Sequence, residues 1–223
     1  MGGVIFLAII GLALVITIGV FAHLREKKRR EAFQMLATQL GMRYVQRDHA
    51  IASRYSFLDK LRQGSNRYAF NVLSGDFDGH PVQVFDFHYE THSHDSKGRR
   101  QTHHHYFSFF ILEQERSFPE LRVYPEGLFS KLGQMLGFDD IDFESLEFSR
   151  AFCVRSTDKK FAYDICHARM MEYLLAHRDL SLEIEGPCVA ISFPRRLDVA
   201  EIPERLRQLV EIRSLFPDYL YRD

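Results

Sequence analysis

The pattern of apolar and polar positions divides the chain into one unbroken apolar run and a long region of short alternating segments. Residues 4–22 carry no charged side chain, and residues 23–30 contain five Lys or Arg. At about 1.5 Å per residue, a helix over the apolar run reaches about 28 Å, close to the hydrocarbon thickness of a bilayer. The pattern therefore predicts a single transmembrane helix at the N-terminus.

A buried core helix and a cleaved signal peptide are the two alternatives for this run. A buried helix of a globular protein rarely has Thr17 as its only polar side chain over such a length. A signal peptide begins with a basic region and has a shorter apolar core, whereas this chain begins with Met-Gly-Gly. Although Val20-Phe21-Ala22 resembles a cleavage site, an uncleaved anchor is favoured.

The basic flank predicts how the anchor is oriented. Its cations are Arg25, Lys27, Lys28, Arg29 and Arg30. Because positive charge stays on the cytosolic side, we expect a single-pass protein of the inner cell membrane, with the N-terminus outside and the C-terminal domain in the cytoplasm. Each cation near an anionic bilayer surface contributes about 1 kcal/mol of attraction, so lipid recognition is one interpretation and a simple stop signal is the other.

Beyond the flank, the periodicity predicts helices and an antiparallel sheet. Apolar spacing favours helices near residues 33–40 and 51–61, with a short strand between them. Alternation predicts a hairpin of residues 67–77 and 81–91 joined by Asp78-Gly79, in which Phe85, Phe87 and Tyr89 share an inward face. Two further strands are expected at 106–113 and 121–124.

The second half adds mixed elements to this sheet. The pattern predicts helices at 128–136, 158–165 and 169–177, a strand at 152–155, and a hairpin over 182–193 turning at Gly186-Pro187. Asp198 and Glu201 have capping-box spacing and begin a final helix. The fold class is thus α+β: an N-terminal transmembrane helix (1–30) followed by one domain (31–223), whose antiparallel sheet is covered by helices. A subdivision near 126–140 stays open.

Composition narrows the function classes. Residues 31–223 hold 24 Lys or Arg and 29 Asp or Glu, and their net charge of −5 argues against a general nucleic-acid surface. Twenty Phe and 10 Tyr supply material for an aromatic core. The cysteines, Cys153, Cys166 and Cys188, are odd in number and lack metal-ligand spacing, so we expect reduced structural thiols.

Several segments of the domain resemble one family. They are Asn71-Val72-Leu73-Ser74-Gly75, the strand with Asp86, residues 147–154, and the stretch from Asp158 to Leu175. Together they are similar to a family of uncharacterised bacterial membrane-anchored proteins with a cytosolic α+β domain. The resemblance implies the architecture; it brings no activity, cofactor or catalytic residue.

Histidines gather in the loop expected between the second and third strands. The candidate metal ligands are His88, His92, His94, His103, His104 and His105, with Asp95 beside them. Imidazole and carboxylate suit zinc or another divalent transition metal. The alternatives are a pH-responsive contact surface and a solvated hairpin tip.

No catalytic motif accompanies these residues. The sequence lacks a glycine-rich phosphate loop, a Gly-x-Ser-x-Gly elbow and a His-Glu-x-x-His pair, and adjacent Cys166-His167 would point about 100° apart on a helix. Enzyme activity is therefore not favoured. We expect a membrane-tethered cytosolic binding or scaffold module with an unidentified protein partner, and the alternatives are a metal-binding sensor or enzyme and an anionic-lipid module.

Overall fold

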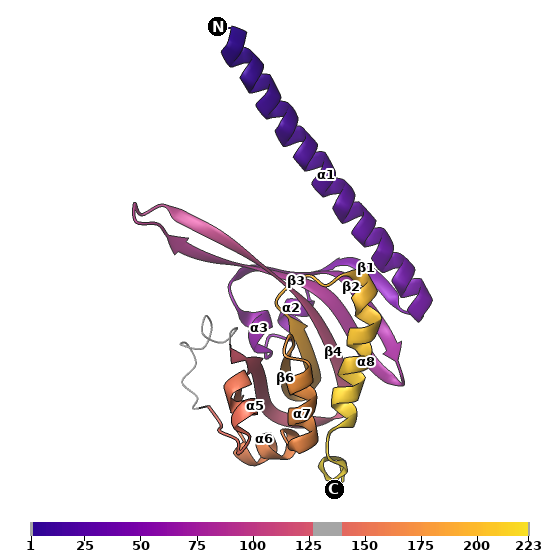
Figure 1. Cartoon of the computed structure of the whole chain (residues 1–223). Coiled ribbons are helices and arrows are strands. Elements are labelled where there is room, and N and C mark those ends of the chain that lie inside the picture. Colours follow the sequence, from indigo (N-terminus) through magenta and orange to yellow (C-terminus); the bar gives the residue numbers. More distant parts are fainter. Residues whose placement is uncertain (1, 127–139, 223) are drawn as a thin grey trace.

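A long bent strand, β4 (Arg100–Pro125), organises a six-stranded antiparallel sheet in this computed structural model (Figure 1). On one edge it pairs with β3 (His80–His94) and then with β5 (Phe152–Ser156), and on the other with β6 (Ser181–Phe193). β2 (Ser65–Phe77) and β1 (Arg43–Asp48) continue the sheet beyond β3. The structure describes residues 2–126 and 140–222, with the side chains of residues 2–9 and 15 outside that description.

The predicted first hairpin is confirmed. Phe77 pairs with His80, and the two turn residues, Asp78 and Gly79, have φ values of 51° and 79°. Two consecutive left-handed residues make the type of turn that matches the twist of a hairpin. The turn sets the pairing of β2 and β3 as far as Leu73 opposite Val84; after the register shift that follows, Asp86 lies opposite Phe70 in β2, and on its other side it lies opposite Ser108 in β4.

Three predictions about the other strands are wrong. The segments at 106–113 and 121–124 are parts of the single strand β4, and most of the expected histidine loop is a β-ribbon that pairs down to His94 and Arg100. The expected hairpin over 182–193 is also one strand, β6, whose two halves both pair with β4. Gly186, with a φ of 58°, lies at the irregular part of this pairing instead of in a reversing turn.

Helices cover both faces of the sheet. The C-terminal part of α1 (Gly2–Leu40) packs on one face with α5 (Leu146–Ala151), α6 (Lys159–Ile165), α7 (Ala168–Ala176) and α8 (Ile202–Ser214). The short helices α2 (Ile51–Arg54) and α3 (Asp59–Arg62), predicted as a single helix, cover the other. The aromatic face of β3 packs inward against them as expected, but Val82 and Val84 on its reverse side are buried too.

The predicted helix start at Asp198 is confirmed. Asp198 and Glu201 form a complete capping box over the 3-10 turn η2 (Val199–Glu201), which leads directly into α8. A second 3-10 turn, η3 (Asp218–Tyr221), follows α8. The helix expected at 128–136 and the subdivision near 126–140 lie in or around residues 127–139, outside the described residues.

The helix α1 is continuous over 39 residues, and its N-terminal part projects away from the sheet (Figure 1). Large apolar side chains on this part are 47–62% exposed: Ile10, Leu12, Leu14, Ile16, Ile18, Val20, Phe21 and Leu24. Within the portion of the chain that the structure describes, no helix has the combination of length and apolar character needed to cross a membrane. The structure supports the α+β part of the predicted fold.

Candidate functional site

A buried carboxylate, Asp86, joins α1 to the sheet. It lies in the middle of β3, and its residue is 1% exposed. The Arg29 guanidinium donates to it through Nε at 3.1 Å and through Nη2 at 2.9 and 3.0 Å. Arg29 Nη1 also donates to the Leu197 carbonyl oxygen at 2.7 Å. One arginine of the basic flank is thus held inside the domain.

Neutral donors complete the shell around Asp86. Asn71 Nδ2 donates to Oδ2 at 2.9 Å, and Ser108 Oγ donates to Oδ1 at 3.0 Å. Ser108 Oγ in turn accepts the backbone N–H of Leu197 at 3.0 Å. Asn71 has a φ of 52° at a register shift in β2, so its left-handed backbone belongs to this arrangement. The carboxylate therefore connects α1, three neighbouring strands and the segment after β6.

A second ion pair lies one turn earlier on α1. Glu26 accepts from Arg196 Nη1 at 2.7 Å and from Nη2 at 3.0 Å, a two-pronged geometry. The hydrogen bond from Arg196 lowers the pKa of Glu26 below its usual value. Arg196 Nε also lies 3.5 Å from Asp86 Oδ2, and its guanidinium stands 5.1 Å from the centre of the Phe70 ring. The two pairs form one charged network at the base of the projecting helix.

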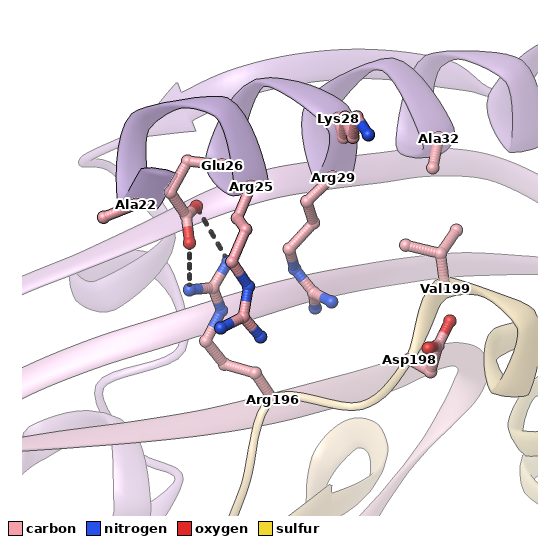
Figure 2. Close-up of a pocket in the computed structure, with 9 residues that line it drawn as sticks. All are labelled: Ala22, Arg25, Glu26, Lys28, Arg29, Ala32, Arg196, Asp198 and Val199. Carbon is pink, nitrogen blue, oxygen red and sulfur yellow. Dashed lines mark hydrogen bonds and ion pairs between the residues drawn. The ribbon is translucent and has the colours of Figure 1, made fainter. Parts of the chain in front are cut away.

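A cleft of about 630 Å³ opens beside this network, between α1 and the segment that follows β6. Figure 2 shows the guanidinium groups of Arg25 and Arg29 directed from α1 into the space that Arg196 enters from below. The full lining is Ala22, Arg25, Glu26, Lys28, Arg29, Ala32, Arg196, Asp198 and Val199. Both acids are engaged, because Glu26 binds Arg196 and Asp198 caps η2. Among the described residues, Arg25 and Lys28 have no carboxylate partner, so the cleft has surplus positive charge.

The structure divides the five predicted membrane-flank cations. Arg25 and Lys28 line the cleft, and Arg29 is bound to Asp86. Lys27 faces an exposed partner, Glu31, at 3.9 Å. Arg30 lines a second cleft. The sequence analysis grouped these cations because they are neighbours in the chain. It did not separate Arg29 from the others, because the partner that buries Arg29, Asp86, lies 57 residues away and nothing in the local sequence indicates it.

The second cleft, of about 360 Å³, lies on the sheet beside α1 and is partly aromatic. Its lining is Glu26, Arg30, Gln46, Arg47, Tyr68, Phe70, Asn71, Tyr106 and Arg196. The Arg47 guanidinium stands 4.3 Å from the centre of the Tyr68 ring, which is itself 4.7 Å from that of His88. This cleft therefore ends beside the histidine cluster.

Strand alternation separates the candidate metal ligands. His88, His92, His94 and His104 share the α1 side of the ribbon, whereas His103 and His105 point to the opposite side. His105 stacks on Tyr89 there, and His103 contacts Ser93. His92 bonds Ser65 and Thr102 through its two ring nitrogens. Asp95 accepts backbone N–H groups within the turn at the tip of the ribbon.

Two of these histidines meet a carboxylate that sequence reasoning missed. His88 Nε2 and His104 Nδ1 are 3.0 Å apart, and Glu90 Oε1 lies 3.5 Å from His104 Nδ1. The ligand atoms of all three residues lie within 4.8 Å of one another. A His/Glu group that could hold a metal is therefore present. The alternation His88-x-Glu90 on one strand was a usable signal, since positions i and i+2 share a face.

Asn66 holds two of these ligands from β2. Its carbonyl oxygen lies 3.2 Å from His88 Nδ1, and its Nδ2 donates to Glu90 Oε1 at 2.6 Å. The pKa of Glu90 is lowered first by this hydrogen bond, and burial lowers the pKa of His88. Both shifts favour a neutral imidazole beside an ionised carboxylate.

A group of buried charges lies apart from these sites. Lys60 is 2% exposed and stands 4.7 Å from the centre of the Tyr124 ring, and the carboxylate of Glu183 accepts the Asp59 backbone N–H at 2.7 Å. Burial lowers the pKa of Lys60 and raises that of Glu183. Neither residue lines either cleft beside α1. The group joins α3 to the sheet.

The three cysteines are free thiols buried in the core. Burial raises the pKa of the Cys166 thiol to about 12, and His167 caps α7 and bonds the Leu215 carbonyl oxygen instead of the thiol. A thiol with a raised pKa is a poor nucleophile. This geometry fits the structural role predicted for the cysteines.

Comparisons with known proteins place the fold. No family model matches the sequence, and a search of curated proteins finds no match. The crystal structure of the mycobacterial trehalose monomycolate transport factor A, TtfA, is similar, with a TM-score of 0.61 and 17% sequence identity, over 85% of this chain and 95% of that chain. At this identity the likeness shows a shared α+β fold with a bacterial protein and leaves membership of a family unassigned.

Proposed function

We propose that the protein is a membrane-tethered binding module whose cationic cleft receives the anionic head group of a lipid. The observation that carries this proposal is the position of Arg25 and Lys28, which have no carboxylate partner among the described residues, in a cleft at the base of the projecting helix that the ion-paired Arg29 and Arg196 also line. The Arg25 guanidinium suits phosphate oxygens, which it can bind through paired N–H donors. The guanidinium groups of Arg29 and Arg196 already donate to Asp86 and Glu26. Arg25 and Lys28 supply the charge that the internal ion pairs leave uncompensated.

The position of the cleft supports a lipid as the source of the anion. Residues 4–22 are uncharged, and eight large apolar side chains between Ile10 and Leu24 are exposed along α1. An exposed apolar surface of this length calls for a covering phase or partner. We propose that lipid covers it and that the rest of the chain lies on the cytosolic side, which puts the cleft at the depth of the head groups.

The ion pairs support a fixed distance between the bilayer and the sheet. Because Glu26 and Arg29 are bound to Arg196 and Asp86, α1 continues into the domain without a flexible joint at this point. A head group in the cleft would contact α1 and the segment after β6 at once. Lipid binding and domain orientation would therefore be coupled.

The test is binding of short-chain phosphatidylglycerol to the full chain in neutral detergent, measured by calorimetry. Replacing both Arg25 and Lys28 by Gln removes two charges worth about 1 kcal/mol each, so we expect affinity to fall about thirtyfold. Lys27→Gln is the matched control, because Lys27 faces Glu31 outside the cleft. Equal losses in both variants, or equal binding of short-chain phosphatidylcholine, would contradict the proposal.

A further inference from the structure

We infer that His88, Glu90 and His104 form a binding site for a zinc ion on the α1 side of the β3–β4 ribbon. The three residues come from two neighbouring strands and bring their ligand atoms within 4.8 Å of one another. Two imidazoles and one carboxylate make a donor set that binds zinc and leaves its fourth position to water or another ligand.

The distances fit one ion with small movements. Two ligand atoms bonded to a tetrahedral zinc at about 2.0–2.1 Å are about 3.3 Å apart. His88 Nε2 and His104 Nδ1 are separated by 3.0 Å, and His104 Nδ1 and Glu90 Oε1 by 3.5 Å. These two separations lie within a few tenths of an ångström of the required value, and the ligand atoms of His88 and Glu90 lie within 4.8 Å of each other.

The state of His88 is fixed by its surroundings. A carbonyl oxygen only accepts, so the contact between the Asn66 carbonyl oxygen and Nδ1 puts the ring proton of neutral His88 on Nδ1. Nε2 then keeps its lone pair and points to His104. Without metal, His104 Nδ1–H donates to this nitrogen; when zinc binds, that proton leaves Nδ1 and His104 carries its proton on Nε2.

Asn66 is the positioning residue of this site. Its backbone carbonyl oxygen accepts from His88 Nδ1, and its side-chain amide nitrogen Nδ2 donates to Glu90 Oε1. Its φ of 49° and the register shift in β2 direct both groups to β3 at once. Partners of this kind orient metal ligands, and their loss costs about 10- to 100-fold in metal affinity.

The site is separate from the other histidines of the ribbon. His103 is the strand neighbour of His104 but points to the opposite face. Adventitious binding by a histidine-rich segment would use both residues alike, whereas the inferred site uses His104 alone. This difference gives a matched control within one strand.

The experiment is calorimetric titration of the chelator-treated full chain with zinc chloride. We expect one zinc per chain with a dissociation constant below about 10 μM, at least tenfold weaker binding in His104→Ala and in Glu90→Gln, and a change below about twofold in His103→Ala. Asn66→Gly retains the left-handed backbone and the carbonyl, and we expect it to weaken zinc about tenfold through loss of the bond to Glu90.

Cobalt substitution provides the second measurement. Cobalt bound to the three ligands and a water gives the intense visible absorption of a four-coordinate ion, and His104→Ala loses it while its far-ultraviolet circular dichroism stays unchanged. His104 is exposed at its side chain, so its removal leaves the core intact. Absence of binding below about 100 μM, or equal losses in His103→Ala and His104→Ala, would overturn the inference.

Discussion

Asp86 determines which cation of the basic flank lies inside the domain, because it binds Arg29. A carboxylate that is 1% exposed needs partners of opposite charge, and Asp86 Oδ2 lies 2.9 Å from Arg29 Nη2 and 3.5 Å from Arg196 Nε. The sequence indicates that Asp86 has a partner, because an Asp inside an apolar strand must be paired. It did not say with which residue, because Arg29 lies 57 positions away and reaches the strand only when α1 packs on the sheet.

We expect Asp86→Asn to lower the free energy of unfolding by about 3–5 kcal/mol, because it leaves the two arginines without their buried counter-charge. Denaturant titration followed by circular dichroism measures this. Glu147→Gln, which removes an exposed ion pair with Arg178, is the control, with an expected loss of about 0–1 kcal/mol. Similar losses in the two variants would show that Asp86 does not have this role.

The metal candidates show the same limit at the residue scale. The sequence identified His88 and His104, but it also grouped them with His103 and His105, which the ribbon sends to the other face. Treating the segment as a loop hid the alternation that separates them. Glu90 was missed for the same reason, because its i, i+2 relation to His88 shows only when the segment is a strand. Asn66 was missed because its role depends on cross-strand register and on an irregularity in β2.

At the scale of elements, the sequence predicted the turns and helix caps that neighbouring residues stabilise. The Asp78-Gly79 turn and the capping box before α8 are present because each is stabilised within a few residues. The division of β4 into two strands failed because the sequence between Glu113 and Phe118 is polar yet remains in the strand. Gly186-Pro187 was taken for a turn, although a left-handed glycine also serves an irregular strand.

The capping box before α8 makes the free energy of unfolding depend on pH, because it contains the ionised side chain of Glu201. Hydrogen bonding from Arg195 first, and then from the Asp198 backbone, lowers the pKa of Glu201 from 4.5 to about 2. A lowered pKa in the folded state adds stability above pH 4.5, and this stability is lost as the pH falls through about 2. We expect Glu201→Gln to be less stable than the native chain above pH 5 and the difference to shrink between pH 4.5 and 2.

Denaturation midpoints measured across this pH range test the prediction. Glu204→Gln is the control on the same helix, because its exposed ion pair with Arg207 contributes well under about 1 kcal/mol. A stability difference for Glu201→Gln that is constant from pH 6 to pH 2 would exclude the proposed ion pairing at the cap.

At the scale of the whole molecule, the helix and the sheet form a connected unit with the cleft at their junction. The apolar part of α1 projects beyond the sheet (Figure 1). The charged network begins further along this helix, at Glu26, which binds Arg196. The sequence predicted the change from apolar to basic residues at this point. It did not predict that Arg196 approaches from the far end of the chain and completes the cleft.

The most direct test of a lipid-binding cleft is photocrosslinking in native membranes from position 32. Ala32 lines the cleft, whereas Met35 on the same helix is 62% exposed and does not. We expect a photoreactive residue at position 32 to form an adduct with an anionic phospholipid, and one at position 35 to form far less of it. The adduct at position 32 should disappear when Arg25 and Lys28 are both replaced by Gln. Equal lipid labelling from the two positions, or labelling unaffected by those replacements, would show that the cleft does not bind an anionic lipid head group.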